Sequence, residues 1–164
     1  MELKACKIYL VTDEKACLGK DFYACIEEAI KGGVKIVQLR EKNISTKDLK
    51  TSGSIKSNRK VTVSGKLEND GVVETAEDVK VSGNIRNTGR IASNGDLTGK
   101  DIATSGTIAS RNVKADNLSN DGVIIANGNI NAKNVKNTKD IAAVGTVSAD
   151  DLITSGNVRA NGKI

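Results

Sequence analysis

Several residue types that commonly build active sites and recognition surfaces are scarce or missing in this chain of 164 residues. It has no histidine, no proline and no tryptophan, and its aromatic residues are two tyrosines and one phenylalanine. The lack of histidine removes the usual general base of enzymes and the commonest metal ligand. The lack of proline is typical of continuous β-sheet ladders, because each proline would remove a backbone hydrogen-bond donor.

Charge of one sign and long apolar runs are also missing. The 25 basic and 20 acidic residues give a net charge of +5, with both signs interspersed. This balance permits binding to anionic surfaces. The chain beyond residue 51, however, offers no aromatic ring for base stacking, so we expect no nucleic-acid partner. No stretch approaches the roughly 20 apolar residues that span a bilayer, and no secretory signal begins the chain, which predicts a cytoplasmic location for the sequence as written.

The composition changes near residue 51. The residues before this point include every cysteine and aromatic of the chain: Cys6, Cys17, Cys25, Tyr9, Phe22 and Tyr23. The cysteines form no C-x-x-C pair, so we expect reduced thiols packed as small apolar groups. From Thr51 onward the chain is rich in Gly, Asn, Ser and Asp, and a small aliphatic residue recurs every five or six positions. We therefore predict two parts, residues 1–50 and 51–164.

Residues 1–50 have the pattern of a βαβ unit. The apolar runs 7–12 and 34–39 predict two parallel strands. Asp21 can cap a helix between them, and Gly32 and Gly33 can end that helix. A polar loop follows, in which Ser45 or Thr46 can begin another helix.

Polar residues follow the second predicted strand. Arg40 offers a planar fork of donors and Lys42 a compact charge, so that with Gln38 they could hold a diphosphate at the end of the strand, where α/β barrels carry their chemistry. The alternative is a solvated loop without a ligand, which is the commoner role of basic residues at such a position.

The runs YLVTD (9–13) and EEAIKGGVKIVQLREKN (27–43), with the following ISTKDL, resemble the start of thiamine phosphate synthase, a TIM-barrel family. The resemblance implies transfer of a hydroxymethylpyrimidine diphosphate to a thiazole phosphate with Mg²⁺. It also implies that the QLREK motif contacts the pyrimidine diphosphate. The implied substrate-binding residues are Gln38, Leu39, Arg40, Glu41 and Lys42.

The resemblance covers less than a third of the chain, or roughly two of the eight βα units of such a barrel. The family's Asn-Asp pair, which helps to hold the metal, and its glycine-rich phosphate loop do not follow Lys50. We therefore expect a truncated barrel start with no catalytic residues, metal site or cofactor. The alternative interpretation is an active thiamine phosphate synthase that uses Mg²⁺.

Residues 51–164 are governed by a repeat. Triplets such as NDG at 69–71, NTG at 87–89 and TSG at 104–106 recur with a period of 16–18 residues. Between them lie regularly spaced aliphatic residues: Leu67, Val73, Val79, Ile85, Ile91, Leu97, Ile102, Ile108, Val113, Leu118, Ile130, Val135, Ile141, Val147, Leu152, Val158 and Ile164. These segments are too short for helices and favour a parallel β-helix over a disordered linker, because disorder would not keep apolar residues in register.

The predicted fold class is therefore mainly β: a solenoid with three short strands per coil, about 17 residues per coil and six to seven coils, preceded by a βαβ fragment. Glycine and asparagine would supply corners that need positive φ or a side-chain turn bond. Stacked Asn69, Asn87 and Asn120 would form amide ladders. An uncapped last coil would leave strand edges open to end-to-end self-association.

The stretch GNIRNTGRIASNGDLTGKDIATSGTIAS and its continuation resemble the repeats of filamentous-haemagglutinin-type exoproteins over residues 52–164. This resemblance implies a secreted or cell-surface stalk with an adhesive role, a host receptor and an outer-membrane transporter as secretion partner. We therefore expect a non-catalytic structural or adhesive solenoid fused to an incomplete enzyme start.

Overall fold

The computed structural model describes residues 9–12, 22–34, 36–39 and 44–164. The chain divides into two compact units, Met1–Glu41 and Lys42–Ile164. The second unit thus begins earlier than the composition change at residue 51.

The first unit contains a parallel strand pair and one described helix, as the βαβ pattern predicts. Strand β1 (Tyr9–Thr12) pairs in parallel with β2 (Ile36–Leu39), with Tyr9 opposite Ile36. Helix α1 (Phe22–Lys31) lies between them in the sequence. The expected cap at Asp21 lies outside the described residues.

Helix α1 ends where its two glycines predict. The N–H of Val34 donates to the carbonyl of Ala29 at 3.1 Å, and the N–H of Gly33 donates to the carbonyl of Ile30 at 3.0 Å. Gly33 has a φ of 102°, which favours glycine because it has no Cβ. These paired bonds form a Schellman motif, which satisfies carbonyls at the helix end.

The second unit is a parallel β-solenoid. Residues 44–164 form three sheets of seven strands, and each coil contributes one strand to each sheet. The first sheet contains β3 (Ile44–Thr46), β6 (Val61–Val63), β9 (Val79–Val81), β12 (Leu97–Thr98), β15 (Val113–Lys114), β18 (Ile130–Asn131) and β21 (Val147–Ser148). The second contains β4 (Leu49–Thr51), β7 (Leu67–Asn69), β10 (Ile85–Asn87), β13 (Asp101–Thr104), β16 (Asn117–Asn120), β19 (Asn134–Asn137) and β22 (Asp151–Thr154). The third contains β5 (Ser54–Ser57), β8 (Val72–Thr75), β11 (Arg90–Ser93), β14 (Thr107–Ser110), β17 (Val123–Ala126), β20 (Asp140–Ala143) and β23 (Asn157–Ala160).

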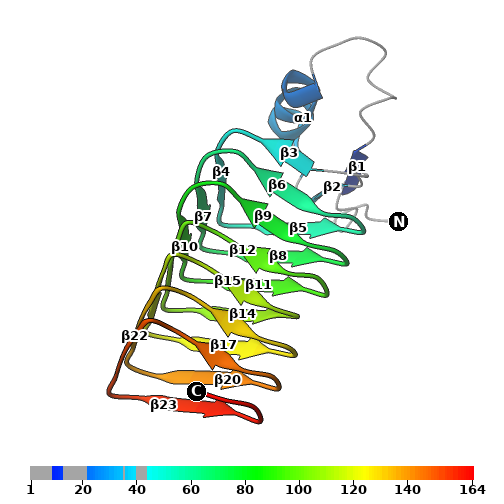
Figure 1. Cartoon of the computed structure of the whole chain (residues 1–164). Coiled ribbons are helices and arrows are strands. Elements are labelled where there is room, and N and C mark those ends of the chain that lie inside the picture. Colours follow the sequence, from blue (N-terminus) through cyan, green and yellow to red (C-terminus); the bar gives the residue numbers. More distant parts are fainter. Residues whose placement is uncertain (1–8, 13–21, 35, 40–43) are drawn as a thin grey trace, which may run out of the picture. The chain divides into compact units, whose positions relative to one another are not determined.

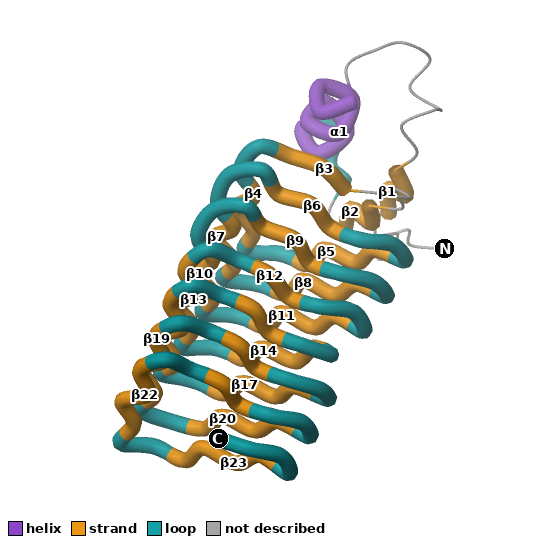
Figure 2. The backbone as a smooth tube through the Cα atoms, in the orientation of Figure 1, coloured by secondary structure: helices purple, strands orange, loops and turns teal. Residues whose placement is uncertain are grey.

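The coils stack in register along the solenoid, as Figure 1 shows from cyan to red. Leu67 lies opposite Ile85, and Ile85 lies opposite Ile102. Ile102 in turn lies opposite Leu118. These steps span 16 to 18 residues, so the predicted period is confirmed. Figure 2 shows the short strands of each coil separated by turns.

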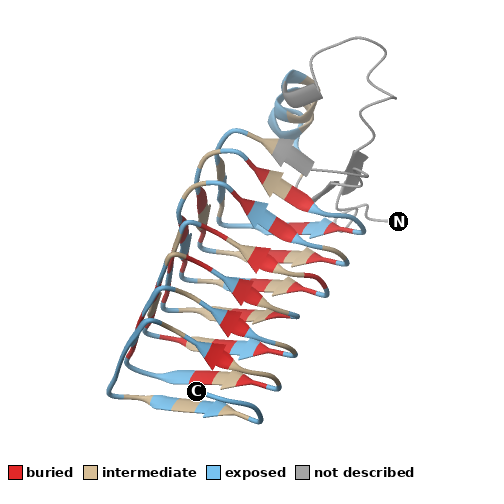
Figure 3. Cartoon of the chain, viewed as in Figure 1, coloured by how far each residue is buried: buried red, intermediate tan, exposed pale blue. Residues whose placement is uncertain are grey.

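The aliphatic repeat fills the interior of the solenoid. Residues alternate between inward and outward positions along each strand, and the red segments of Figure 3 mark the buried ones. Leu67, Ile91, Ile108 and Ile130 are each 0% exposed. Since the interior is narrow, branched aliphatic side chains fill it without large rings.

The last coil departs from this pattern. Leu152 is 36% exposed and Ile164 is 65% exposed, although both belong to the predicted aliphatic series. Within residues 44–164 no further coil follows to cover them.

The loop and second helix expected after residue 42 are wrong over the described residues. Ile44–Thr46 and Leu49–Thr51 are strands β3 and β4 of the first coil. They pair with β6 and β7, with Ile44 opposite Val61 and Leu49 opposite Leu67. The aliphatic spacing therefore begins before residue 51, and pairing with the next coil outweighs the local capping preference of Ser45 and Thr46.

Candidate functional site

The residues that resemble a diphosphate site lie at the end of β2. Gln38 and Leu39 are its last two residues and pair with Val11 and Thr12 of β1. The C-terminal ends of both strands therefore meet at one edge, as a barrel-type site requires. Arg40, Glu41 and Lys42, the other substrate-binding residues implied by the motif, lie outside the described residues.

The chain that follows this edge enters a different architecture. Ile44 already pairs with Val61 of the next solenoid coil, and residues 44–164 form coils throughout. Transfer between two phosphorylated substrates requires groups from several barrel strands to converge on both reactants. Residues 44–164 place their strands in solenoid sheets and contribute no barrel strand.

A polar column runs along the second sheet, buried in its five inner members and more exposed at its two ends, and we name it the Asn/Thr column. It consists of Thr51, Asn69, Asn87, Thr104, Asn120, Asn137 and Thr154, stacked in register. Asn69 Nδ2 donates to Asn87 Oδ1 at 2.7 Å, so the predicted ladder between these two residues is confirmed. Asn120 Nδ2 makes the same contact with Asn137 Oδ1 at 2.7 Å.

Each of these buried amides is also tied to the backbone. Asn120 Nδ2 donates to the carbonyls of Gly122 and Asp140 at 3.1 and 3.0 Å, and Asn120 Oδ1 accepts from the N–H of Gly122. Thr104 interrupts the amide series and accepts from Asn87 Nδ2 at 3.0 Å. Within the described residues every buried side-chain nitrogen or oxygen has a hydrogen-bond partner. The column therefore fixes the stacking of coils, because a buried amide without these partners would be costly.

Glycine recurs where the chain passes from the second to the third sheet. Of the two expectations for these corners, the side-chain turn bond is confirmed, since the N–H of Gly71 donates to Asn69 Oδ1 at 3.2 Å. Positive φ is wrong for them, since Gly33 is the glycine with positive φ in the described part of the chain. The reason is close approach: a Cβ at Gly106 would overlap the carbonyl oxygen of Gly89 in the preceding coil. Lys139 occupies this place in one coil, so the requirement is not absolute.

Ion pairs lie on the outer surface, both within a coil and between neighbouring coils. On the second sheet Lys66 Nζ lies 3.0 Å from Glu68 Oε1, and Lys50 Nζ lies 3.4 Å from Glu68 Oε2. The hydrogen bond from Lys66, followed by the charges of Lys66 and Lys50, lowers the pKa of Glu68 below its usual value. Both lysine side chains are exposed and Glu68 is half-buried, so each pair contributes little to folding. A shallow groove runs beside them along β7, β10 and β13.

Two further ion pairs lie between coils. Arg111 Nε donates to Asp96 Oδ1 at 2.9 Å, and this bond lowers the pKa of Asp96. Lys133 Nζ lies 2.9 Å from Asp116 Oδ1 and lowers the pKa of Asp116 by hydrogen bonding and charge. Each described group with a shifted pKa is therefore a partner in one of these surface ion pairs.

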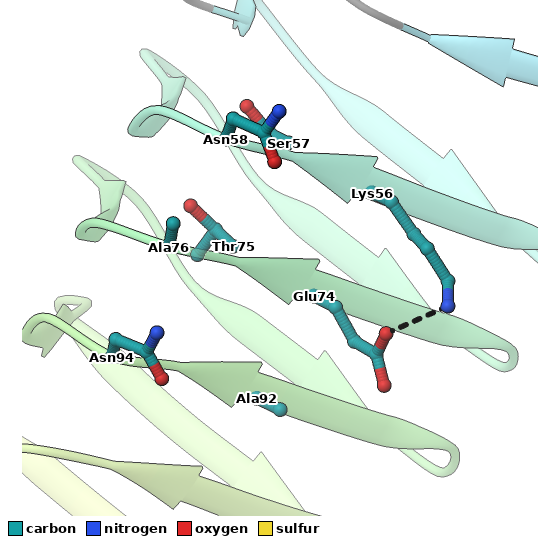
Figure 4. Close-up of a pocket in the computed structure, with 8 residues that line it drawn as sticks. All are labelled: Lys56, Ser57, Asn58, Glu74, Thr75, Ala76, Ala92 and Asn94. Atoms are coloured by element: carbon teal, nitrogen blue, oxygen red, sulfur yellow. Dashed lines mark ion pairs between the residues drawn. The ribbon is translucent and has the colours of Figure 1, made fainter.

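The third sheet presents a different outer surface. Lys56 Nζ of β5 reaches Glu74 Oε2 of β8 at 3.0 Å, and Figure 4 shows Ala92 of β11 next along the same face. A shallow pocket here is lined by these three residues and by residues at the ends of the same strands and in the turns that follow them. The side chains that follow Ala92 in register are those of Ala109, Ile125 and Ala142, which are apolar.

The described residues contain no group of three or more cysteine, aspartate and glutamate side chains placed to hold a metal ion. Among the described helices, none has the length and apolar character to cross a membrane.

Comparison with known proteins finds similarity in the N-terminal half of the chain. The family described as thiamine monophosphate synthase matches residues 8–84, less than half of the 164 residues. The match therefore extends over β3 to β9, which the structure places in the solenoid. No solved structure matches the chain.

Curated relatives resemble the N-terminal part alone. The chain is 90% identical over 48 residues to a thiamine-phosphate synthase of Fusobacterium nucleatum subsp. nucleatum, which covers 29% of this chain and 23% of that protein. It is 55% identical over 47 residues to one of Clostridioides difficile, covering 28% and 22%. A third, from Clostridium acetobutylicum, is 64% identical over 42 residues, covering 26% and 20%. The chain spans less than a quarter of the length of these relatives.

Proposed function

We propose that residues 42–164 serve as a non-catalytic structural stalk with an adhesive role, like the repeats of haemagglutinin-type exoproteins. The observation that carries this proposal is the continuous register of seven coils, sealed by the aliphatic interior and the Asn/Thr column. Seven coils at about 4.8 Å make a rod about 30 Å long. Such a rod is suited to act as a spacer that presents other parts of a protein. Its interior polar groups are already paired with one another and are not available to a ligand.

The same proposal places the working protein at the cell surface, with an outer-membrane transporter as secretion partner. The support is the sequence resemblance of residues 52–164 together with the solenoid. A bead-binding assay tests the adhesive role. Beads coated with the full chain should adhere to epithelial cells, whereas beads coated with Ile108→Asp should not, because a buried lone charge disrupts the aliphatic stack. Equal binding of both beads would contradict the proposal.

The competing candidate is thiamine phosphate synthase, favoured by the 90% identity over 48 residues and by the QLREK motif at 38–42. We propose that the chain lacks this activity, because its solenoid supplies none of the later barrel strands. The test is formation of thiamine phosphate from both substrates with Mg²⁺, using a complete synthase as the positive control. No product above background is expected. Product that disappears in Arg40→Ala would establish the enzyme instead.

A further inference from the structure

The outer face of the third sheet carries two columns of side chains, one at the first and one at the third position of each strand. We name this surface the third-sheet face. The first column is Ser54, Val72, Arg90, Thr107, Val123, Asp140 and Asn157. The second column is Lys56, Glu74, Ala92, Ala109, Ile125, Ala142 and Arg159.

The middle of this face is apolar and its ends are charged. Ala92, Ala109, Ile125 and Ala142 follow one another in the second column, and Ile125 is 45% exposed. Ile125 is flanked in its column by Ala109 and Ala142, and these small neighbours leave room for a side chain from an opposing surface. By itself this pattern does not say what covers it.

The charged side chains at the ends of the third-sheet face indicate which molecule binds there. We propose that the third-sheet face binds the same face of a second copy of this chain, with the two solenoid axes antiparallel. A two-fold axis along the strands places each column opposite itself and reverses the order of coils. With the coils of β14 and β17 at the centre, Glu74 faces Arg159 and Arg90 faces Asp140, and symmetry makes each contact twice.

The same register matches side-chain size. Ala109 faces Ile125, so a small residue meets the largest one, and Ala92 faces Ala142. The other face-to-face arrangement, with parallel axes, sets each strand against its own copy and pairs Glu74 with Val72 and Arg159 with Asn157. It brings no opposite charges together, which is why the antiparallel arrangement is favoured.

The four charges keep atoms available for this pairing, and Glu74, which Lys56 holds through Oε2 at 3.0 Å, offers Oε1 to Arg159 of the second copy. Arg159 is exposed and makes no ion pair within the described residues. Arg90 Nε lies 4.0 Å from Glu74 Oε1, the longest of the described ion pairs, so its remaining donors can reach Asp140 of the second copy. Asp140 Oδ1 accepts from Asn157 Nδ2 at 2.8 Å and is oriented by that bond.

The area of the third-sheet face limits the strength of the dimer. Six coils at about 4.8 Å and four residues at about 3.3 Å give a face of about 29 by about 13 Å, or roughly 760 Å² for both copies. Stable complexes bury about 1,200–2,000 Å². The dimer is therefore weak, and its association depends on concentration and on salt.

Sedimentation velocity on the full chain under reducing conditions tests this interface, from about 10 µM to about 1 mM protein. We expect a monomer–dimer equilibrium that weakens severalfold between about 0.02 M and about 0.5 M NaCl, as screening shortens the reach of the charges. A chain that stays monomeric throughout, or a dimer insensitive to salt, overturns the proposal.

Variants locate the face and its register. Arg159→Glu should raise the dimer dissociation constant roughly tenfold, because the contact occurs twice and becomes repulsive, and Ile125→Glu should abolish dimerisation. The matched control is Arg86→Glu, which changes the same charge on the second sheet and should leave the dimer intact. Melting temperatures within a few degrees of the parent show that each variant is folded.

A charge exchange tests the antiparallel register. Lys56→Glu and Glu74→Lys together keep the ion pair between β5 and β8 with its polarity reversed, but they replace the 4.0 Å contact of Glu74 with Arg90 by a like-charge contact. Because Arg159→Glu then meets Lys at position 74, the triple variant should dimerise more tightly than Arg159→Glu alone, although less tightly than the parent. Failure to restore the dimer, or loss of the dimer in Arg86→Glu, contradicts this arrangement.

Discussion

At the scale of the residue, two kinds of position control the solenoid: the glycines at the corner between the second and third sheets and the amides of the Asn/Thr column. Both act between coils. A Cβ at Gly106 would meet the backbone of Gly89, and Asn69 bonds to Asn87, which lies 18 residues further along the chain. Their roles therefore depend on stacking between coils, in addition to the local turn bonds of the asparagines.

The corner glycines should differ in their tolerance of alanine. Gly106→Ala should lower the free energy of unfolding by about 1–3 kcal/mol, because its Cβ overlaps a backbone carbonyl that cannot move freely. Gly53→Ala is the matched control, since a Cβ there meets nothing within 4 Å, and it should change stability by less than about 1 kcal/mol. Urea unfolding of both variants measures the difference, and equal effects would contradict the close-approach explanation.

The Asn/Thr column should accept threonine and reject leucine. Asn120→Leu removes bonds to Asn137, Gly122 and Asp140 and should destabilise the protein by roughly 2–4 kcal/mol. Asn120→Thr should cost less, because the buried Thr104 already serves the column by accepting from Asn87 Nδ2 at 3.0 Å. Thermal unfolding compares the two, and a leucine variant as stable as the threonine variant would refute the role of the column.

At the scale of the element, each strand is too short to be stable alone and is held by the strands of neighbouring coils. Ion pairs such as Asp116 with Lys133 add to this pairing on the outside. The folded-state pKa values of Asp116, Asp96 and Glu68 are lowered by their basic partners. A lowered carboxylate pKa stabilises the fold above the unfolded-state value of about 4, and this contribution is lost as the pH falls through the folded-state pKa.

The melting temperature should therefore fall on acidification, most steeply between about pH 5 and about pH 2. Asp116→Asn should make that fall shallower, since it removes one of the carboxylates with a lowered pKa. Melting curves recorded by circular dichroism at several pH values provide the measurement. A melting temperature that is constant or higher at about pH 3 would show that these pairs do not favour the folded state.

The element scale also shows what sequence reasoning could reach. The aliphatic spacing after residue 51 was sufficient to predict coils of 16–18 residues, because each inward position needs a buried side chain. The aliphatic series omitted Ile124, which is 0% exposed, because the adjacent Ile125 is also aliphatic and the spacing alone does not show which of the two points inward. It also missed β3 and β4, because a polar segment containing Ser45 and Thr46 has the local pattern of a helix start, and only pairing with the next coil makes it strand.

At the scale of the whole molecule, the chain joins a βαβ segment with the motif of one family to a solenoid of a different architecture. The composition change at residue 51 predicted two parts, and the two compact units are residues 1–41 and 42–164. Two features could not be predicted without the strand register: the place of Thr104 between two asparagines of the Asn/Thr column, and the alignment of charged side chains on the third-sheet face. A shift of one residue would move every inward side chain to the outer face.

Amide hydrogen exchange on the full chain tests the central claim, that residues 44–164 form one stacked solenoid, most directly. The N–H groups of Leu67, Leu97 and Ile130 each donate to a carbonyl of the following coil at 2.9 Å and should exchange slowly and to similar extents. Protection should recur with the coil period through the inner coils. Exchange at unfolded-chain rates across residues 51–164 would contradict the solenoid and with it the proposed role as a stalk.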